Sequence, residues 1–335
     1  MEFEYETNAP KDDELLVLRR VLRRRYARFI GVDSSIRPIL NIWPGGFAGV
    51  GAIGLAQALS ERNLIEGFDA NAGNSIGLPI CAFAASGQLH ELIDIILNRC
   101  TNTAPIFVSQ WSPWGTNEFI SWPRWLRGGS VFDFSRLIPL LYEKLDVEAL
   151  RASPVDVWAI VSELESARPD LLHLQGAHED ADIMRIIMAS LHIPELCAGE
   201  VRINGKAFGD GACVNIFPIR RIVEKYQPTD MLVFANRPKD WHPSFYNRMS
   251  EEPLLRHLTP EMKKGMRTRE ERLQRRIDFL RSRNDFRYLI IYPKKDVSMF
   301  CNDKKVSADL YESGRLYMHQ LLDTCFGQEQ KFLHM

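Results

Sequence analysis

The sequence predicts an α/β protein with three layers, α/β/α, around a mostly parallel central sheet. Short apolar segments typical of buried strands alternate with longer segments in which apolar residues recur at helical spacing. This alternation is typical of a parallel sheet covered by helices on both faces. The chain has 335 residues, of which 45% are hydrophobic and 25% charged, so it is long enough for one large domain with a sizeable core.

The expected elements follow one another along the whole chain. Strands are expected near residues 38–43, 68–72, 155–161, 170–174, 201–208, 231–235 and 288–292. Helices are expected near residues 13–29, 50–63, 75–86, 88–98, 135–145, 179–190, 217–226, 260–282 and 306–325. No internal repeat or low-complexity linker is evident in this order.

The first expected helix is rich in arginine. Its apolar residues fall near one face and are Leu15, Leu18, Leu22, Tyr26 and Phe29. Its arginines are Arg19, Arg20, Arg23, Arg24, Arg25 and Arg28. A basic amphipathic helix can lie on an anionic membrane, and the more ordinary alternative is that it packs on the domain with a solvated arginine face.

The first expected strand ends in a glycine-rich loop, Pro44-Gly45-Gly46-Phe47-Ala48-Gly49, which leads into an apolar helix. Such a loop leaves several backbone N–H groups unpaired, and the helix dipole adds positive potential there. We therefore expect an anion site. If the anion is a tetrahedral oxyanion, the site is an oxyanion hole made by the backbone of Gly45, Gly46, Phe47 and Gly49.

The helix after this loop contains a second glycine pattern, Gly49-Val50-Gly51-Ala52-Ile53-Gly54. It matches the dinucleotide fingerprint G-x-G-x-x-G, and Asp69 follows the first glycine by about 20 residues, as a ribose-binding acid would. In that fingerprint the glycines follow the strand directly, whereas here residues 44–48 intervene. We interpret Gly51 and Gly54 as small residues of a closely packed helix, and a nicotinamide-dependent oxidoreductase stays a minor alternative.

The most informative motif is Gly73-Asn74-Ser75-Ile76-Gly77, which has the G-x-S-x-G form of a nucleophile elbow. In such an elbow a strand ends, the chain reverses sharply, and a helix begins with the serine at the strained corner. Gly73 and Gly77 are expected there because a side chain at either position would collide with the neighbouring strand or helix. The pattern alone also fits a glycine-rich turn before a buried helix.

A third motif follows an expected hairpin over residues 201–208, which turns at Asn204-Gly205. The hairpin leads to Gly209-Asp210-Gly211-Ala212, so Asp210 is a carboxylate on a tight turn at the end of a strand. Taken alone, Asp210 is explained by stabilisation of its own turn, with Gly211 allowing the tight bend. A catalytic carboxylate is the alternative explanation.

These three motifs, in this order, resemble the patatin-like phospholipase family. Two neighbouring stretches agree with the family pattern, Ala189-Ser190-Leu191-His192-Ile193-Pro194 and Asn215-Ile216-Phe217-Pro218-Ile219. The resemblance covers roughly residues 36–236, with a looser similarity to about residue 325. One position departs from the family, because Ala48 stands where the oxyanion loop usually has arginine.

The resemblance implies a patatin-like fold and a Ser75–Asp210 dyad that hydrolyses lipid esters of the phospholipase A or lysophospholipase type. A serine hydroxyl is a weak nucleophile until a base takes its proton. Asp210 would be that base, and the oxyanion would sit on backbone N–H groups of Gly45–Gly49. The change at Ala48 leaves open a catalytically weak or inactive membrane-surface binding protein on the same fold.

A Ser–acid–His triad of the α/β-hydrolase type is a lesser alternative, since it uses the same G-x-S-x-G motif. It requires a histidine after the acid, and His242, His257 and His319 are available. None of the three lies in a glycine-flanked or strand-end context, so we expect them to be surface or packing residues.

Composition restricts the remaining function classes. The formal net charge is -1, which disfavours nucleic acid as a partner. The six cysteines show no C-x-x-C pair and no carboxylate loop has calcium-binding spacing, so we expect neither metal nor cofactor. No apolar run reaches membrane-spanning length and the N-terminus is acidic, so we expect a cytoplasmic protein, with membrane contact only at the periphery.

We divide the chain into residues 1–35, an N-terminal extension with the basic helix; residues 36–325, a patatin-like catalytic domain; and residues 326–335, a tail. The core of that domain is expected over residues 36–236, with helical and strand additions over residues 237–325. Besides the Arg19–Arg28 helix, the tryptophan-rich loop Trp111–Trp125 is a candidate for membrane contact, and packing on the core explains it equally well. The arginine- and glutamate-rich stretch 261–287 is expected to be a solvated helix.

Overall fold

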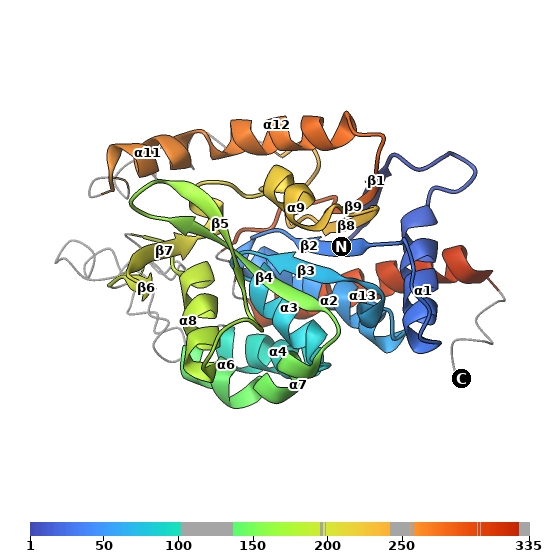
Figure 1. The fold of residues 1–335 in the computed structure, drawn as a ribbon, viewed down its shortest axis with the longest axis horizontal. Coiled ribbons are helices and arrows are strands. Elements are labelled where there is room, and N and C mark those ends of the chain that lie inside the picture. The colour runs from blue at the N-terminus through green and yellow to red at the C-terminus, as the bar shows by residue number, and fades with distance from the viewer. Residues whose placement is uncertain are drawn as a thin grey trace.

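A computed structural model of the chain describes residues 1–101, 137–194, 197, 199–241, 255, 258–299, 301 and 303–327. Within these residues one sheet of nine strands runs through the molecule in the order β1-β9-β8-β2-β3-β4-β7-β6, with β5 also paired to β4 (Figure 1). The strands are β1 (Phe3–Thr7), β2 (Pro38–Ile42), β3 (Ala70–Gly73), β4 (Asp156–Glu163), β5 (Arg168–His173), β6 (Val201–Ile203), β7 (Lys206–Asp210), β8 (Asp230–Phe234) and β9 (Arg287–Pro293).

The sheet is mixed, with a parallel centre. Strands β9, β8, β2, β3 and β4 are parallel neighbours, and every residue of β2, β3 and β8 is buried. Antiparallel partners extend both sides of this centre: β1 pairs with β9, β5 and β7 pair with β4, and β6 pairs with β7. The prediction of a three-layer α/β/α fold is confirmed, and the parallel central strands are extended on both sides by antiparallel ones, so that the sheet as a whole is mixed.

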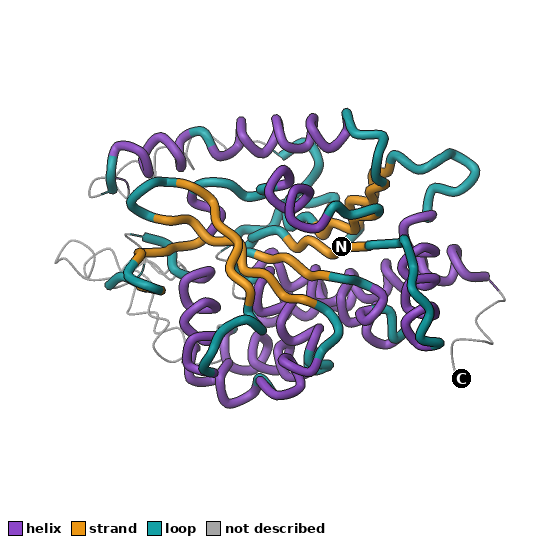
Figure 2. The backbone as a smooth tube through the Cα atoms, viewed as in Figure 1, coloured by secondary structure: helices purple, strands orange, loops and turns teal. Residues whose placement is uncertain are grey.

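Helices cover both faces of the sheet (Figure 2). The upper face in Figure 1 carries α9 (Ile219–Tyr226), α11 (Pro260–Arg267) and α12 (Arg269–Arg281). The other face carries α1 (Leu16–Phe29), α2 (Val50–Glu61), α3 (Gly77–Ala85), α4 (Leu89–Ile95), α6 (Leu137–Lys144), α7 (Val147–Ala152), α8 (Asp180–Leu191) and α13 (Lys304–Phe326). The single helix expected over 260–282 is two helices that meet at Thr268, and α7 was not predicted.

The N-terminal residues, which the sequence assigns to an extension, pack on the sheet. Strand β1 is an edge of the sheet, and ion pairs hold α1 against the amino-terminal ends of the central strands. Arg20 binds the buried Asp230 at 2.7 Å, while Arg24 and Arg28 bind Asp69 at 2.9 and 2.6 Å. The predicted solvated arginine face is therefore wrong for these three arginines.

The second glycine pattern lies in the contact between α2 and α13. A side chain on Gly54 would collide with the backbone of Tyr311, and one on Gly314 would collide with the carbonyl of Gly51. Asp69, the candidate ribose acid, is already paired with α1. The interpretation of Gly51 and Gly54 as close-packing residues is confirmed, and the dinucleotide fingerprint is excluded at this position.

Several other predictions concern the surface and the termini. Within the described ranges, no helix has both the length and the apolar character that crossing a bilayer requires. All six cysteines are free thiols. The Trp111–Trp125 loop and the tail over 326–335, apart from residues 326 and 327, lie outside the described residues.

Candidate active site

The serine of the G-x-S-x-G motif lies at a sharp turn between strand β3 and helix α3. Its backbone has φ +52°, in the left-handed region that residues with a side chain rarely adopt. The residue is 8% exposed, and α3 begins two residues later at Gly77. Such local strain is typical of functional positions, because the surrounding structure must hold the residue there.

The two glycines of the motif allow the close approach of the turn to the sheet. A side chain on Gly77 would collide with the carbonyl of Ile42 at the end of β2, and one on Gly73 would collide with the backbone of Gly77. These collisions agree with the expectation that only glycine fits at both positions. The same holds for Gly211, the glycine after Asp210, where a side chain would collide with the carbonyl of Ile160 on β4.

Asp210 is the last residue of β7 and is 1% exposed. One carboxylate oxygen, Oδ1, accepts a hydrogen bond from the N–H of Ala212 at 2.8 Å. The carboxylate therefore caps the turn that follows, as the ordinary explanation of this residue requires. Its other interaction links it to the serine.

The structure places Ser75 near Asp210, close enough for the Ser75 side chain to lower the pKa of the Asp210 carboxyl. Burial raises the pKa of Asp210 to about 6, because a carboxylate is poorly solvated inside the protein. The N–H of Ala212, the Ser75 hydroxyl and the positive charge of Arg269 each oppose this rise. A carboxyl with this pKa is ionised at neutral pH yet basic enough to accept a proton.

The end of helix α8 holds both members of the pair by backbone contacts. The N–H of Ser75 donates to both the carbonyl oxygen and the hydroxyl of Ser190, at 3.1 and 3.0 Å. The N–H of Asp210 donates to the carbonyl of His192 at 2.7 Å. Ser190 and His192 belong to the Ala189–Pro194 stretch, whose residue pattern alone does not predict that they position Ser75 and Asp210.

The glycine-rich loop forms a short 3-10 helix over Gly46–Gly49 directly before α2. Gly46 has φ +53°, and a side chain there would collide with the carbonyl of Met299. Side chains on Gly45 and Gly49 would collide with Asn236 and with Ile76, the residue after the serine. The loop therefore lies against the turn that carries Ser75, which is where a serine nucleophile would require an oxyanion hole.

The backbone N–H groups of this loop differ in their engagement. The N–H of Phe47 donates to the carbonyl of Met299 at 3.0 Å, and that of Ala48 donates to the carbonyl of Gly45 at 3.0 Å. Phe47, predicted as an oxyanion donor, is therefore already engaged through its N–H. Among the described residues, the N–H groups of Gly45 and Gly46 have no hydrogen-bond acceptor. Neither Asn236 nor Met299 was identified from the sequence.

The histidine alternative receives no support from the described residues. His319 lies on α13, and its Nε2 is 2.7 Å from Oε2 of Glu61, at the end of α2 remote from the glycine loop. It is a packing histidine, as expected. His242 and His257 lie outside the described residues.

Comparison with known proteins gives one family and several distant structures. The model of the family described as "Patatin-like phospholipase" matches residues 45–222, more than half of the chain. No curated protein sequence matches significantly.

Two solved structures are similar at low identity. VipD from Legionella pneumophila is 13% identical with a TM-score of 0.42, covering 87% of this chain and 67% of that one. A chain of the ExoU–SpcU complex from the type III secretion system of Pseudomonas aeruginosa is 12% identical with a TM-score of 0.30, covering 87% of this chain and 52% of that one. This chain thus spans about half of that second protein. With the family model matching across the glycine loop, the elbow and the Asp210 turn, the chain belongs to the patatin-like phospholipase family.

Proposed function

We propose that the protein is a lipid acyl hydrolase of the phospholipase A or lysophospholipase type, with Ser75 as nucleophile and Asp210 as base. The observation that carries the proposal is the proximity of the strained, buried Ser75 to the buried Asp210 carboxylate. Two side chains from separate motifs meet there beside a glycine-rich loop. Family membership supports lipid esters as the substrate class.

In the first half-reaction Asp210 accepts the proton of the Ser75 hydroxyl while Oγ forms a bond to the ester carbonyl carbon. The carbonyl π electrons move onto oxygen and give a tetrahedral oxyanion. When these electrons return, the bond between the carbonyl carbon and the alcohol oxygen breaks, and protonated Asp210 gives its proton to that oxygen. The alcohol leaves and the acyl group stays on Ser75.

In the second half-reaction water replaces the alcohol. Asp210 takes a proton from the water as its oxygen attacks the acyl carbon, and a second oxyanion forms. Its collapse breaks the bond to Oγ, which recovers the proton from Asp210. The products are a free carboxylic acid and the original enzyme, so no external reductant, oxidant or cofactor is needed.

The N–H groups of Gly45 and Gly46 are our candidates for the donors that stabilise the oxyanion. They belong to the loop packed on the nucleophile turn, and Phe47 instead braces the loop through its bond to Met299. A backbone oxyanion hole does not require the arginine that the family usually has, because N–H groups make the contact. Loss of one such donor typically costs about 3 kcal/mol in the barrier.

Ala48 favours the second candidate, a membrane-surface binding protein with little or no catalysis. Its side chain is buried rather than directed at a substrate. The family arginine therefore has no equivalent at this position, and only activity measurements separate the two candidates.

The test is hydrolysis of phospholipids in mixed vesicles, with products identified by mass spectrometry. Ser75→Ala should lower the rate by about 10⁴-fold or more, and Asp210→Asn by about 10³-fold or more, with the fold retained. Ser282→Ala, which changes an exposed serine on the other face of the sheet, is the matched control. Turnover near that of the wild type in either site variant would refute the assignment. Silence of the wild type on every ester would favour the binding protein.

A further inference from the structure

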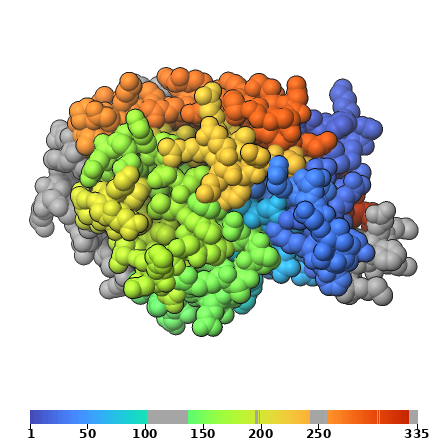
Figure 3. Space-filling model, in the orientation of Figure 1, coloured from blue at the N-terminus to red at the C-terminus, as the bar shows by residue number. Residues whose placement is uncertain are grey.

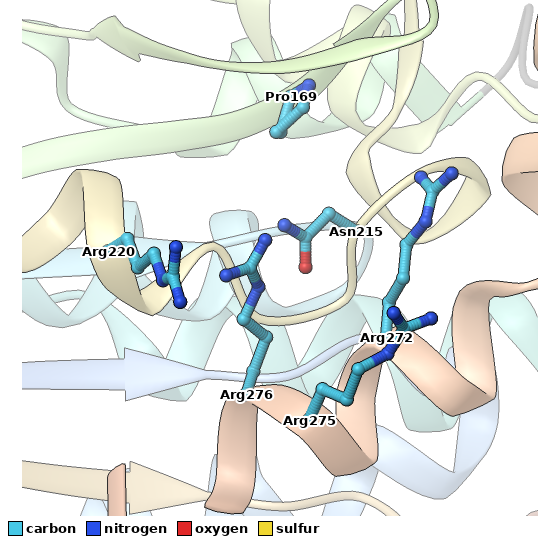
Figure 4. A pocket seen from close by; sticks show the side chains of 6 residues that line it. All are labelled: Pro169, Asn215, Arg220, Arg272, Arg275 and Arg276. Atoms are coloured by element: carbon cyan, nitrogen blue, oxygen red, sulfur yellow. The ribbon is translucent and has the colours of Figure 1, made fainter. Parts of the chain in front are cut away.

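A hollow of about 390 Å³ lies between β5, α9, α12 and the chain that follows Asp210 (Figure 4). This volume falls in the range of small-molecule sites, roughly 300–1,000 Å³. Its lining residues are Pro169, Asn215, Arg220, Arg272, Arg275 and Arg276. Four of the six are arginines and none is acidic, so the hollow has a strong positive charge.

The arginines come from two helices that face each other. Arg272, Arg275 and Arg276 are three and four residues apart on α12, which places them on one side of that helix. Arg220 projects from α9, and Figure 4 shows all four side chains around the same space. In Figure 3 both helices lie at the front surface, α9 in yellow and α12 in orange.

Acidic neighbours do not balance this charge. Glu271 is 3.5 Å from Arg275, but both side chains are largely exposed, so the pair is weak. Asp170, next to Pro169 on β5, is bound by Arg221 at 3.0 Å.

The half-buried Arg276 has no ion-pair partner among the described residues. Burial lowers its pKa most, and the charges of Arg220, Arg272 and Arg275 lower it further. Crowding like charges costs free energy, and a bound anion would offset this cost.

We propose that Arg220, Arg272, Arg275 and Arg276 form a binding site for a ligand that carries phosphate groups with at least two negative charges. The guanidinium fork binds phosphate oxygens in pairs, and four forks around one hollow suit a dianion or polyphosphate better than a carboxylate. Asn215, buried at 4% exposure, supplies a polar wall. The phosphate can belong to a lipid head group or to a soluble ligand.

The site is connected to the candidate catalytic residues through one chain segment. Nη1 of Arg272 donates to the carbonyl of Val214 at 3.1 Å, and the N–H of Asn215 donates to the carbonyl of Gly211 at 2.9 Å. The side chain of Asn74, adjacent to the serine, donates to the carbonyl of Ile216 at 3.4 Å. A phosphate that pulls Arg272 towards the hollow would therefore move residues 211–216, which follow Asp210 and contact the neighbour of Ser75. Only this link between phosphate binding and catalysis rests on the proposed function.

The test measures binding, not hydrolysis. Thermal unfolding and titration calorimetry of the wild type with inorganic tripolyphosphate test the soluble source. Sedimentation of Ser75→Ala protein with phosphatidylcholine vesicles that contain phosphatidic acid tests the lipid source, since the Ser75 change leaves the lipids intact. Vesicles that contain phosphatidylserine are the control for binding to the negative charge of a phosphodiester head group. Failure of the proposed hydrolysis does not affect these readouts.

Arg276→Gln should weaken binding by about tenfold or more, and Arg220→Gln provides a second, exposed position. Arg23→Gln, which removes one exposed charge on α1, should bind like the wild type. Without ligand, Arg276→Gln should not lower the melting temperature, because it relieves repulsion, whereas loss of a purely structural arginine would lower it. Binding of either source that depends on these arginines supports the proposal. Absence of binding to both sources, or unchanged binding by the arginine variants, overturns it.

Discussion

Ser75 and Asp210 both occupy positions that stability alone would disfavour. The left-handed backbone of Ser75 costs about 1 kcal/mol or more, and the carboxylate of Asp210 is ionised in a buried position. Functional sites commonly retain such costs because the chemistry depends on them. The two residues therefore offer tests that read stability as well as activity.

Asp210→Asn should stabilise the protein at neutral and higher pH. The folded pKa of about 6 exceeds the ordinary value of 3.8, so the folded state binds the proton more tightly than the unfolded state. Burial of the charged form therefore costs stability above pH 6, and this cost disappears as the pH falls below about 4. The gain in free energy of unfolding is at most about 3 kcal/mol.

Urea unfolding of both proteins at about pH 8 and about pH 4.5 measures this difference. The stabilisation should shrink at the lower pH. An Asn variant less stable than the wild type at both values would contradict a destabilising buried charge at Asp210.

Hydrolysis should rise with pH through about 6 as Asp210 loses its proton. Arg269 lowers the pKa of Asp210 by its charge, so Arg269→Gln should move this acidic limb to higher pH. The pH dependence of kcat/KM measures the shift, with Arg23→Gln as the control for net charge. An acidic limb that stays in place would show that Arg269 does not act on the base.

The candidate reactive residues stand out in the sequence, whereas most of their supporting contacts do not. Ser75 and Asp210 each lie in a short motif whose glycines explain a local turn. Their supports come from remote parts of the chain: Ser190 lies 115 residues after Ser75, and Asn236 lies 193 residues after Trp43, whose carbonyl it binds. No local pattern carries such distances.

At the scale of elements, buried central strands were predicted because continuous apolar runs mark them. Strand β1 was not predicted from the sequence, because its glutamates make the segment look like an acidic, solvent-exposed terminus. Its residues Phe3, Tyr5 and Thr7 nevertheless alternate with glutamates, as in a strand. It gains its pairing from β9, at the other end of the sequence. The break between α11 and α12 was also missed, since both helices share one charge pattern.

The α2–α13 contact provides a test at this scale. Glycine to alanine in an exposed helix normally stabilises by about 1 kcal/mol. Gly314→Ala should instead destabilise by about 2 kcal/mol or more, because the new methyl group collides with the carbonyl of Gly51. Thermal unfolding measures the sign, and Leu316→Ala, at a position 55% exposed on the same helix, should have little effect. A more stable Gly314→Ala protein would contradict this packing.

At the scale of the whole molecule, the two ends of the parallel strands have different roles. Ser75 follows the carboxyl end of β3, whereas Asp69 and Asp230, which bind α1, stand at the amino ends of β3 and β8. About one strand length, roughly 17 Å, separates these ends. Helix α1 therefore packs at the amino ends of the strands, opposite the candidate site. This position disfavours α1 as the element that presents the site to a membrane.

Arg20→Met should destabilise the fold by about 3 kcal/mol, because it leaves the carboxylate of Asp230 buried without its cation. Arg23→Met on the same helix changes an exposed arginine and should have little effect. Chemical unfolding compares the two variants. Equal stabilities would show that the N-terminal region is an appendage, as the sequence-based division of the chain assumed.

The central claim is that Ser75 is activated by Asp210, and a fluorophosphonate probe tests it most directly. The probe forms a phosphorus–oxygen bond to an activated serine and releases fluoride. Peptide mapping by mass spectrometry should find the adduct on Ser75 of the wild type, at a rate that increases with pH through about 6 and falls strongly in Asp210→Asn. An unmodified Ser75 in folded wild-type protein, or an equal labelling rate in Asp210→Asn, would contradict the account.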